Sequence, residues 1–230
     1  MFALVVRSAL LVLMGAALVT PAAMAQKTVS FATDDGGVIF ADVYGSRERA
    51  VVLAHGGRFN KETWARQAEA LVASGFEVLA IDFRGYGPSH GPGDKDPLDA
   101  PLSLDVLAAV RYLHRNGVKS VSIVGGSMGG AAAGDACIAA RPGEIDRLVM
   151  LGAAPNQSAD KLKCPSLFIV ARDDSSEDGP RLPGIRTQYE KAPEPKKLIV
   201  LEGSAHAQFL FQTDQSSRVM KEIIRFLSAR

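Results

Sequence analysis

The sequence has few cysteines, no marked excess of charge and no apolar run long enough to span a bilayer. Two cysteines, Cys137 and Cys164, are too few for a disulfide scaffold, and no Cys-x-x-Cys pair or Cys/His cluster points to a metal site. The 26 basic and 25 acidic side chains nearly balance, which excludes the dense positive charge of a typical nucleic-acid-binding protein. With 47% hydrophobic and 22% charged residues, the 230-residue chain suits one globular domain.

The first residues differ from the rest. Met1–Ala25 contains a single charged side chain, Arg7, followed by an apolar stretch that is shorter than the roughly 20 residues of a spanning helix. Pro21 then breaks the run, and the small residues around Ala25 suit cleavage by a signal peptidase. We therefore expect residues 1–25 to be a secretory signal, a mature domain of residues 26–230, a periplasmic or extracellular location and no membrane anchor after cleavage. Export would permit a Cys137–Cys164 disulfide, but the spacing leaves a reduced pair equally open.

The rest of the chain alternates between strand-like and helix-like periods. Continuous apolar runs predict strands, and apolar residues spaced by three and four predict helices between them. Repeated β–α–β alternation predicts an α/β fold with a largely parallel central sheet covered on both faces. The predicted strands are 29–32, 38–44, 50–54, 76–81, 121–124, 147–151, 166–170 and 197–201, and the predicted helices are 64–73, 102–115, 128–140, 185–191 and 219–227.

The main chemical motif is the Gly-x-Ser-x-Gly sequence of residues 125–129, which places Ser127 directly between a strand and a helix. A nucleophile elbow needs this strand–turn–helix context and small neighbours, because the backbone turns sharply at the serine. A second match at residues 87–91 places Ser89 among prolines and glycines, where no helix can start. Ser127 is therefore the candidate nucleophile, and Ser89 is a loop residue.

A serine hydroxyl needs a general base. Of four histidines, His206 follows the last predicted strand and fits that role best. His55 begins a Gly-Gly turn and is expected to hold that loop by hydrogen bonds. His90 lies in the loop of the second serine motif, and His114 ends a helix, where a solvated ring is expected.

The acid that orients the base is expected after the strand 166–170, where Asp173 and Asp174 both stand. Asp174 is preferred and Asp173 stays open as the second choice. Two backbone amides must also face the developing oxyanion. We expect the amide of Met128, directly after the serine, and that of Gly57, in the turn after the strand 50–54, to supply them.

Five motifs in this order resemble the α/β-hydrolase superfamily over nearly all of residues 28–230. They are residues 54–57 (AHGG), 81–89 (IDFRGYGPS), 125–129 (GGSMG), 171–174 (ARDD) and 203–206 (GSAH). The family's Gly-x-x-Asp acid motif aligns its aspartate with Asp174 and has Ala171 in place of its glycine. By the same resemblance the stretch 82–89 is structural. Because residues 152–164 leave no room for a cap domain, the chain resembles the small capless esterases, close in size to dienelactone hydrolases.

The resemblance implies a serine hydrolase of the carboxylesterase or lipase type, which cleaves small-molecule esters with a Ser127–Asp174–His206 triad and needs no metal or organic cofactor. An acyltransferase, a thioesterase or a serine exopeptidase could use the same triad. A catalytically inactive, exported binding protein is the alternative from a different functional class. The acyl group, the alcohol and the oligomeric state cannot be derived from the sequence.

Overall fold

The computed structural model describes residues 27–96 and 99–229. The expected signal segment, residues 1–25, lies outside the described residues. The strands are β1 (Lys27–Ala32), β2 (Val38–Tyr44), β3 (Arg49–Ala54), β4 (Glu77–Ile81), β5 (Ser120–Gly126), β6 (Leu148–Leu151), β7 (Ser166–Ala171), β8 (Ser175–Ser176), β9 (Gly179–Pro180) and β10 (Lys196–Leu201). The α-helices are α1 (Ala65–Ala73), α2 (Leu102–Arg115), α3 (Met128–Ala139), α4 (Arg181–Lys191) and α5 (Ser216–Leu227). Short 3₁₀ helices are η1 (Lys61–Trp64), η2 (Ala159–Lys161) and η3 (Ala207–Gln212).

Eight strands form one sheet in the order β1-β2-β4-β3-β5-β6-β7-β10. The β1–β2 hairpin is antiparallel, and β2 also runs antiparallel to β4, whereas β4, β3, β5, β6, β7 and β10 are all parallel. The α/β fold expected from the alternating periods is confirmed. Since the carboxyl ends of parallel strands share one edge, the loops after β3, β5, β7 and β10 converge there.

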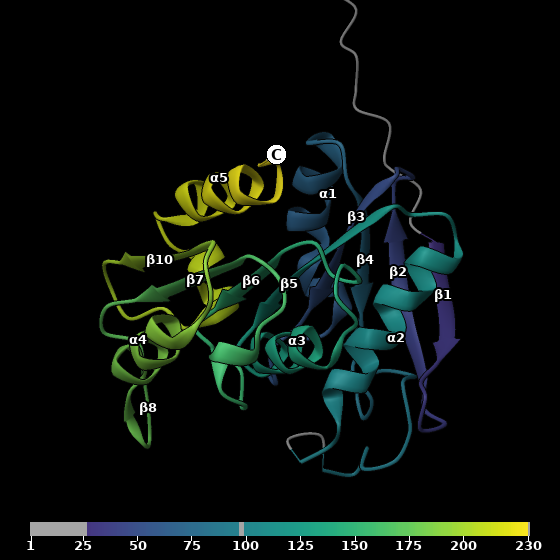
Figure 1. The fold of residues 1–230 in the computed structure, drawn as a ribbon, viewed down its shortest axis with the longest axis horizontal. Helices are drawn as coiled ribbons and strands as arrows, with labels where there is room; N and C mark the ends of the chain where they lie inside the picture. The colour runs from purple at the N-terminus through teal and green to yellow at the C-terminus, as the bar shows by residue number, and fades with distance from the viewer. Residues whose placement is uncertain (1–26, 97–98, 230) are drawn as a thin grey trace, which may run out of the picture.

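Helices cover both faces of the sheet (Figure 1). One apolar cluster joins α2, α3 and α4 to one face, and a second cluster joins α1 and α5 to the other. This two-sided burial explains why β3–β7 read as continuous apolar runs rather than alternating ones. Within the described ranges, no helix combines the length and hydrophobicity needed to cross a membrane.

Helix α4 begins at Arg181, four residues before the helix expected from Ile185. Pro183 and Gly184 disguise this start in the sequence. Pro183 is the third helical residue, where the backbone N–H has no partner within the helix and its absence therefore costs nothing. The β8–β9 hairpin precedes the helix, and neither two-residue strand has a periodic signal that could predict it.

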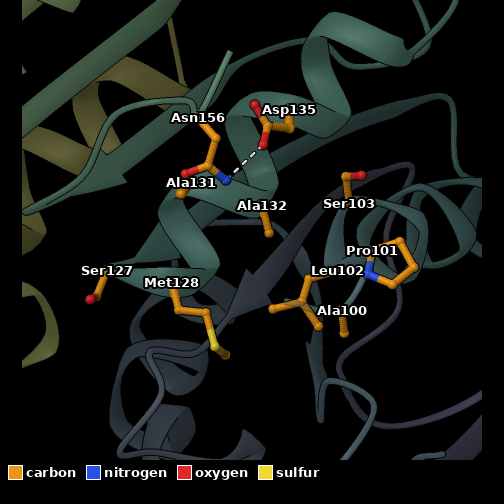
Figure 2. A pocket seen from close by; sticks show the side chains of 10 residues that line it. All are labelled: Ala100, Pro101, Leu102, Ser103, Ser127, Met128, Ala131, Ala132, Asp135 and Asn156. Carbon is orange, nitrogen blue, oxygen red and sulfur yellow. Dashed lines mark hydrogen bonds between the residues drawn. The ribbon is translucent and has the colours of Figure 1, made fainter. Parts of the chain in front are cut away.

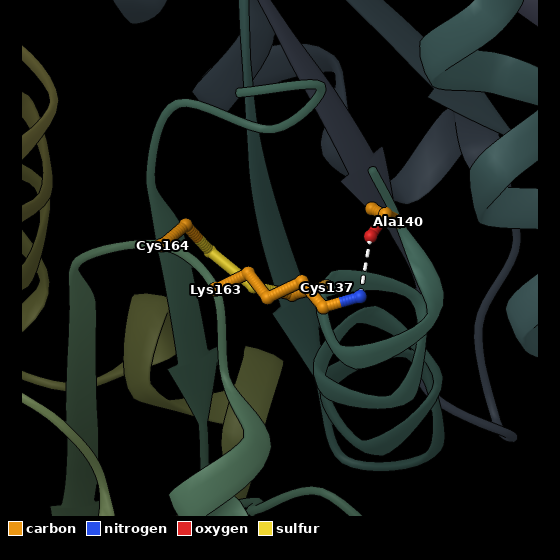
Figure 3. Close-up of a disulfide and its surroundings, with 4 residues drawn as sticks. All are labelled: Cys137, Ala140, Lys163 and Cys164. Carbon is orange, nitrogen blue, oxygen red and sulfur yellow. Dashed lines mark hydrogen bonds between the residues drawn. A yellow bond between two sulfur atoms is a disulfide. The ribbon is translucent and has the colours of Figure 1, made fainter. Parts of the chain in front are cut away.

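Cys137 and Cys164 form a disulfide, the alternative that the spacing left open (Figure 3). The bond joins α3 to the segment that leads into β7. Beside it, Lys163 Nζ donates a hydrogen bond to the Ala140 carbonyl at 2.7 Å. Both contacts tie the end of the helix that follows Ser127 to a neighbouring strand.

The stretch 82–89 has the structural role that the family resemblance implies, and Arg84 is its centre. The Arg84 side chain is fully buried and donates hydrogen bonds to Asp105 on α2 at 2.8 and 2.6 Å, to Asp35 in the β1–β2 turn at 2.6 and 3.0 Å, and to the Pro92 carbonyl at 2.9 Å. The hydrogen bond from Arg84 lowers the pKa of Asp35 to about 2. One side chain thus connects the hairpin, helix α2 and the loop after β4.

Replacing Arg84 by methionine is expected to destabilise the fold by about 3–5 kcal/mol, because the fully buried Asp105 carboxylate would lose its counter-charge. Chemical unfolding at neutral pH measures this free energy. Lys119→Met is the matched control, since the Lys119–Glu48 pair is exposed on both sides and should contribute less than about 1 kcal/mol. Equal stability of the two variants would contradict the assignment.

Candidate active site

The motif around Ser127 forms the strand–turn–helix junction that its sequence context predicts, with β5 ending at Gly126 and α3 starting at Met128. Ser127 has φ +52° and ψ −120°, a conformation that non-glycine residues rarely adopt. Neither Gly125 nor Gly129 can be replaced by a larger residue, because a Cβ atom would collide with the backbone. A Cβ atom on Gly125 would lie 2.3 Å from the Gly129 carbonyl oxygen, and one on Gly129 would lie 2.4 Å from the Ala54 oxygen. No side chain fits at either position, so the backbone can close tightly around the serine.

The strained backbone at Ser127 predicts that Ser127→Gly unfolds at higher denaturant concentration than Ser127→Ala. Both variants lack the hydroxyl, but only glycine adopts this conformation without strain, and the relief outweighs its greater unfolded-state entropy by about 1 kcal/mol. Equilibrium denaturation of the two proteins in parallel measures the difference. A glycine variant no more stable than the alanine variant would show that the turn is not strained.

The structure brings Ser127, His206 and Asp174 into one hydrogen-bonded chain. The distance from Ser127 Oγ to His206 Nε2 is 2.7 Å, and that from His206 Nδ1 to Asp174 Oδ2 is 2.8 Å. A carboxylate only accepts, so Nδ1 donates to Asp174 and Nε2 is left to accept the serine proton. Of the two aspartates, Asp174 is buried and contacts the histidine, whereas the Asp173 side chain is exposed and its backbone N–H bonds the Gly203 carbonyl at 2.9 Å.

The contact between His206 and Asp174 has two supporting residues that the sequence analysis missed. Gly152, after β6, leaves the space in which the pair meets: a Cβ atom there would lie 2.9 Å from His206 Nδ1 and 3.1 Å from Asp174 Oδ2. Arg181, the first residue of α4, places its Nε atom 3.4 Å from the other Asp174 oxygen, Oδ1. That oxygen is buried without a hydrogen-bond donor among the described residues, so the guanidinium supplies its compensating charge.

The turn after β3 packs against the serine. His55 is fully buried, and burial lowers its pKa, which keeps the ring neutral. Its Nδ1 donates to the Gly56 carbonyl at 2.9 Å, and its Nε2 accepts the Phe83 amide at 3.2 Å. The Phe59 amide is a second donor to the Gly56 oxygen, at 2.9 Å. His55 thus holds the loop by hydrogen bonds, as the sequence analysis expects.

The turn that carries Gly57 contacts the start of α3, and these two segments contain the amides expected to bind the oxyanion. A Cβ atom on Gly57 would lie 3.8 Å from Met128 Sδ, and one on Gly56 would lie 3.3 Å from Ser127 Cβ. Met128 is the first residue of α3, so its N–H has no partner within the helix. The Gly57 N–H donates to no acceptor among the described residues. Neither N–H group therefore has an acceptor among the described residues.

The remaining histidines lie elsewhere. The His114 ring is half-buried and only partly solvated, which corrects the expectation for it in part: its Nδ1 contacts the Val118 carbonyl at 3.0 Å and its Nε2 contacts the Glu144 carbonyl at 2.9 Å, because the loop before β6 packs on the end of α2. His90 is exposed, and its backbone pairs with Val38. Across residues 27–96 and 99–229, no group of three or more His, Cys, Asp or Glu side chains could hold a metal ion.

Two hollows of about 380 and 500 Å³ share Ser127, Met128, Ala131 and Asn156. The smaller one extends to the start of α2, where Pro101 and Leu102 lie across from Met128 (Figure 2). A 2.9 Å hydrogen bond from Asn156 to Asp135 borders it. The larger one extends to the β8–β9 hairpin and α4, including Arg181 and Ile185. Residues 152–164 contribute only the three-residue η2, and no helical cap covers the serine from that segment.

Comparison with known proteins places this site in a family context. The family model described as alpha/beta hydrolase fold matches residues 49–228 of this chain. A non-heme chloroperoxidase from Streptomyces lividans is 31% identical over 124 residues, which cover 54% of this chain and 44% of the relative. A bifunctional esterase/perhydrolase from Acinetobacter calcoaceticus is 36% identical over 99 residues, which cover 43% of this chain and 34% of the relative. The matched segments thus span less than half of these relatives.

Solved structures resemble the whole fold. An esterase from Pyrococcus furiosus matches with a TM-score of 0.70 at 21% identity, covering 90% of this chain and 92% of its own. Dienelactone hydrolase from Anabaena variabilis matches with a TM-score of 0.68 at 21% identity, covering 88% and 96%. Likeness at this identity shows a shared fold. Together with the match over residues 49–228, it shows that the chain belongs to the alpha/beta hydrolase family.

Proposed function

We propose that the protein is a serine hydrolase that cleaves small carboxylic esters through an acyl-enzyme. The observation that carries the proposal is the continuous hydrogen-bonded chain from Ser127 through His206 to Asp174. Membership of a hydrolase family and the esterase fold of its structural neighbours support it.

Each residue then has one chemical role. His206 Nε2 takes the proton as Ser127 Oγ attacks the ester carbonyl, and the carbonyl oxygen becomes an oxyanion that the Met128 and Gly57 amides stabilise. Asp174 holds the tautomer in which Nε2 is free and stabilises the imidazolium that forms. The histidine returns the proton to the leaving alcohol, and water, deprotonated by His206, later attacks the acyl carbon and releases the acid and Ser127.

The hollows beside Ser127 favour compact substrates. The smaller hollow mixes apolar walls (Leu102, Met128 and Ala132) with Ser103 and the Asp135–Asn156 pair. A polar far wall and a volume near 380 Å³ suit a short acyl group better than a fatty chain. The larger hollow, with its polar lining and Arg181, can hold the alcohol part.

A series of p-nitrophenyl esters of increasing acyl length tests this function, together with titration by a fluorophosphonate that labels activated serines. We expect stoichiometric labelling of Ser127 and kcat/KM highest for acyl groups of about two to four carbons. A folded protein that neither hydrolyses any ester nor reacts with the probe would favour the inactive binding protein instead.

Perhydrolysis is a second candidate, because one relative is named an esterase/perhydrolase and others haloperoxidases. In that reaction hydrogen peroxide replaces water as the attacking group, and the acyl-enzyme yields a peracid. Peracid formation from an ester and peroxide, measured beside hydrolysis, separates the two. Alcohol acceptors, thioester substrates and peptide substrates in the same assay address the acyltransferase, thioesterase and exopeptidase alternatives, respectively.

We also propose that the protein acts outside the cytoplasm. The signal-like pattern of Met1–Ala25 supports this, and so does the Cys137–Cys164 disulfide, since such bonds persist in oxidising compartments. Mass spectrometry of protein secreted by a bacterial host would find a mature chain that starts at Gln26. A cell-associated protein that still begins at Met1 would contradict the proposal.

A further inference from the structure

Gln208 is a buried polar side chain that the triad does not use. It lies two residues after His206, is 5% exposed, and its Oε1 accepts the Gly56 N–H at 2.7 Å. Its Nε2 donates to Thr63 Oγ1 at 3.2 Å. A Cβ atom on Gly126 would lie 3.3 Å from both Gln208 Cγ and Oε1, so the side chain also packs against the residue before the serine. Gln208 therefore touches the oxyanion turn and the serine turn from the loop that carries the base.

These contacts fix two consecutive peptide planes. Within a trans peptide the C=O and the N–H point in opposite directions. Gln208 holds the N–H of the His55–Gly56 peptide, and the His55 ring and the Phe59 amide hold the C=O of the next one. The Gly57 N–H belongs to that second peptide and must point away from those two donors. Without Gln208 the first peptide loses its hydrogen bond, and because Gly56 has no Cβ atom, that peptide can rotate and pull on the two hydrogen bonds that hold the second one.

The backbone at Ala207, between His206 and Gln208, is held in an unfavourable conformation by the contacts of its two neighbours. Ala207 has φ +49°, which is unfavourable for a residue with a Cβ atom, and it is 1% exposed. Such a conformation persists where neighbouring contacts hold both sides of it. Here the holding contacts are the His206 hydrogen bonds on one side and those of Gln208 on the other.

We propose that Gln208 is a positioning residue that aligns the Gly57 amide for the oxyanion and links this amide to the loop of the catalytic base. The proposal rests on the proposed ester hydrolysis and deepens it. Gln208 acts through the Gly56 N–H and does not touch the reacting atoms. Its loss therefore weakens stabilisation of the transition state without changing substrate binding, while His206 keeps its own hydrogen bonds to Ser127 and Asp174.

The test replaces Gln208 by methionine, which has similar length and offers the amide only a weakly accepting sulfur in place of the oxygen. We expect kcat for a short p-nitrophenyl ester to fall about 10- to 100-fold, less than deletion of an oxyanion donor, while KM changes less than about threefold. The midpoint of the pH–rate profile stays where it is in the wild type. Affinity for an alkyl boronic acid, which mimics the tetrahedral intermediate, falls by the same factor as kcat/KM.

Thr63→Val is the matched control, because it removes the partner of Gln208 Nε2 and keeps the Oε1–Gly56 bond. It should keep wild-type kcat. Gln208→Leu provides a second variant if the methionine protein does not fold. Wild-type kcat in a folded Gln208 variant, or a loss expressed in KM or in the pH midpoint, would overturn the proposal.

Amide hydrogen exchange gives a readout that does not depend on the reaction. The Gly56 N–H should be protected in the wild type and in Thr63→Val and should exchange at least tenfold faster in Gln208→Met. If the wild type hydrolyses no ester, the proposed function fails, whereas the exchange rates still decide whether Gln208 holds the turn. Unchanged Gly56 exchange in Gln208→Met would overturn the positioning role by itself.

Discussion

Alanine in place of Ser127 is expected to lower kcat for short p-nitrophenyl esters by about 10⁴-fold or more and to leave the fold intact. In the proposed mechanism the hydroxyl is the attacking group, and its hydrogen bond to His206 at 2.7 Å is the contact through which it loses its proton. The substituted side chain is half-buried at a turn, so its loss opens no core cavity. Initial rates, far-ultraviolet circular dichroism and thermal unfolding of the purified variant measure both parts of the prediction.

Ser89→Ala is the matched control for this experiment, because Ser89 belongs to the second Gly-x-Ser-x-Gly sequence. Its Oγ accepts the Phe40 amide at 2.9 Å and the residue is 3% exposed, so the variant should lose about 1 kcal/mol of stability and keep its kcat. If both alanine variants kept wild-type turnover, neither serine would be the nucleophile. If only Ser89→Ala lost turnover, the two motifs would have exchanged roles.

The contrast between the two serine motifs shows which parts of this molecule follow from local sequence. A nucleophile elbow is encoded within about ten residues, because the apolar run of β5, the glycines at 125 and 129 and the small residues of α3 are contiguous. The β1–β2 hairpin and the other parallel strands have equally local signals, so the α/β fold could be predicted from periodicity. The family match over residues 49–228 confirms that prediction.

The roles of Gly152 and Gln208 could not be predicted from the sequence, because they depend on contacts between distant segments. Gly152 follows β6 with no motif around it, and its importance lies in the space it leaves for side chains 22 and 54 positions further along the chain. Gln208 likewise gains its role from Gly56, 152 residues away. A glutamine two residues after a histidine has no signature of its own. Its burial would have been the signal, and burial is a property of the folded chain.

The prediction for the start of α4 was wrong, and that for the His114 ring was wrong in part, for a related reason. A histidine at a helix end is normally hydrated, but here the loop before β6 places the Glu144 carbonyl 2.9 Å from Nε2. Pro183 and Gly184 normally interrupt helices, but they occupy the first turn of α4, where they are tolerated. In both cases a tertiary contact or a positional exception outweighed the local preference.

Asparagine in place of Asp174 is expected to lower kcat by about 10³- to 10⁴-fold with little change in KM. The Asp174 carboxylate holds the His206 Nδ1 proton at 2.8 Å, which leaves Nε2 free to accept the Ser127 proton. An asparagine can turn its NH₂ group toward Nδ1 and stabilise the opposite tautomer, in which Nε2 carries the proton and cannot act as a base. Steady-state kinetics with a short ester, beside the unfolding free energy, measure the effect.

Asp173→Asn is the matched control, since it makes the same chemical change one residue earlier on an exposed side chain. Its kcat should stay within about twofold of the wild type. Arg181→Met tests the effect of the charge beside Asp174 without changing the tautomer of His206. It removes the cation 3.4 Å from Asp174 Oδ1 and keeps the hydrogen bond between Asp174 Oδ2 and His206 Nδ1. Its loss of kcat should therefore be much smaller than that of Asp174→Asn. Equal losses in Asp174→Asn and Arg181→Met would mean that the charge balance around the aspartate matters more than the tautomer it selects. A large loss in Asp173→Asn alone would instead assign the acid to the neighbouring residue and require the loop after β7 to rearrange during catalysis.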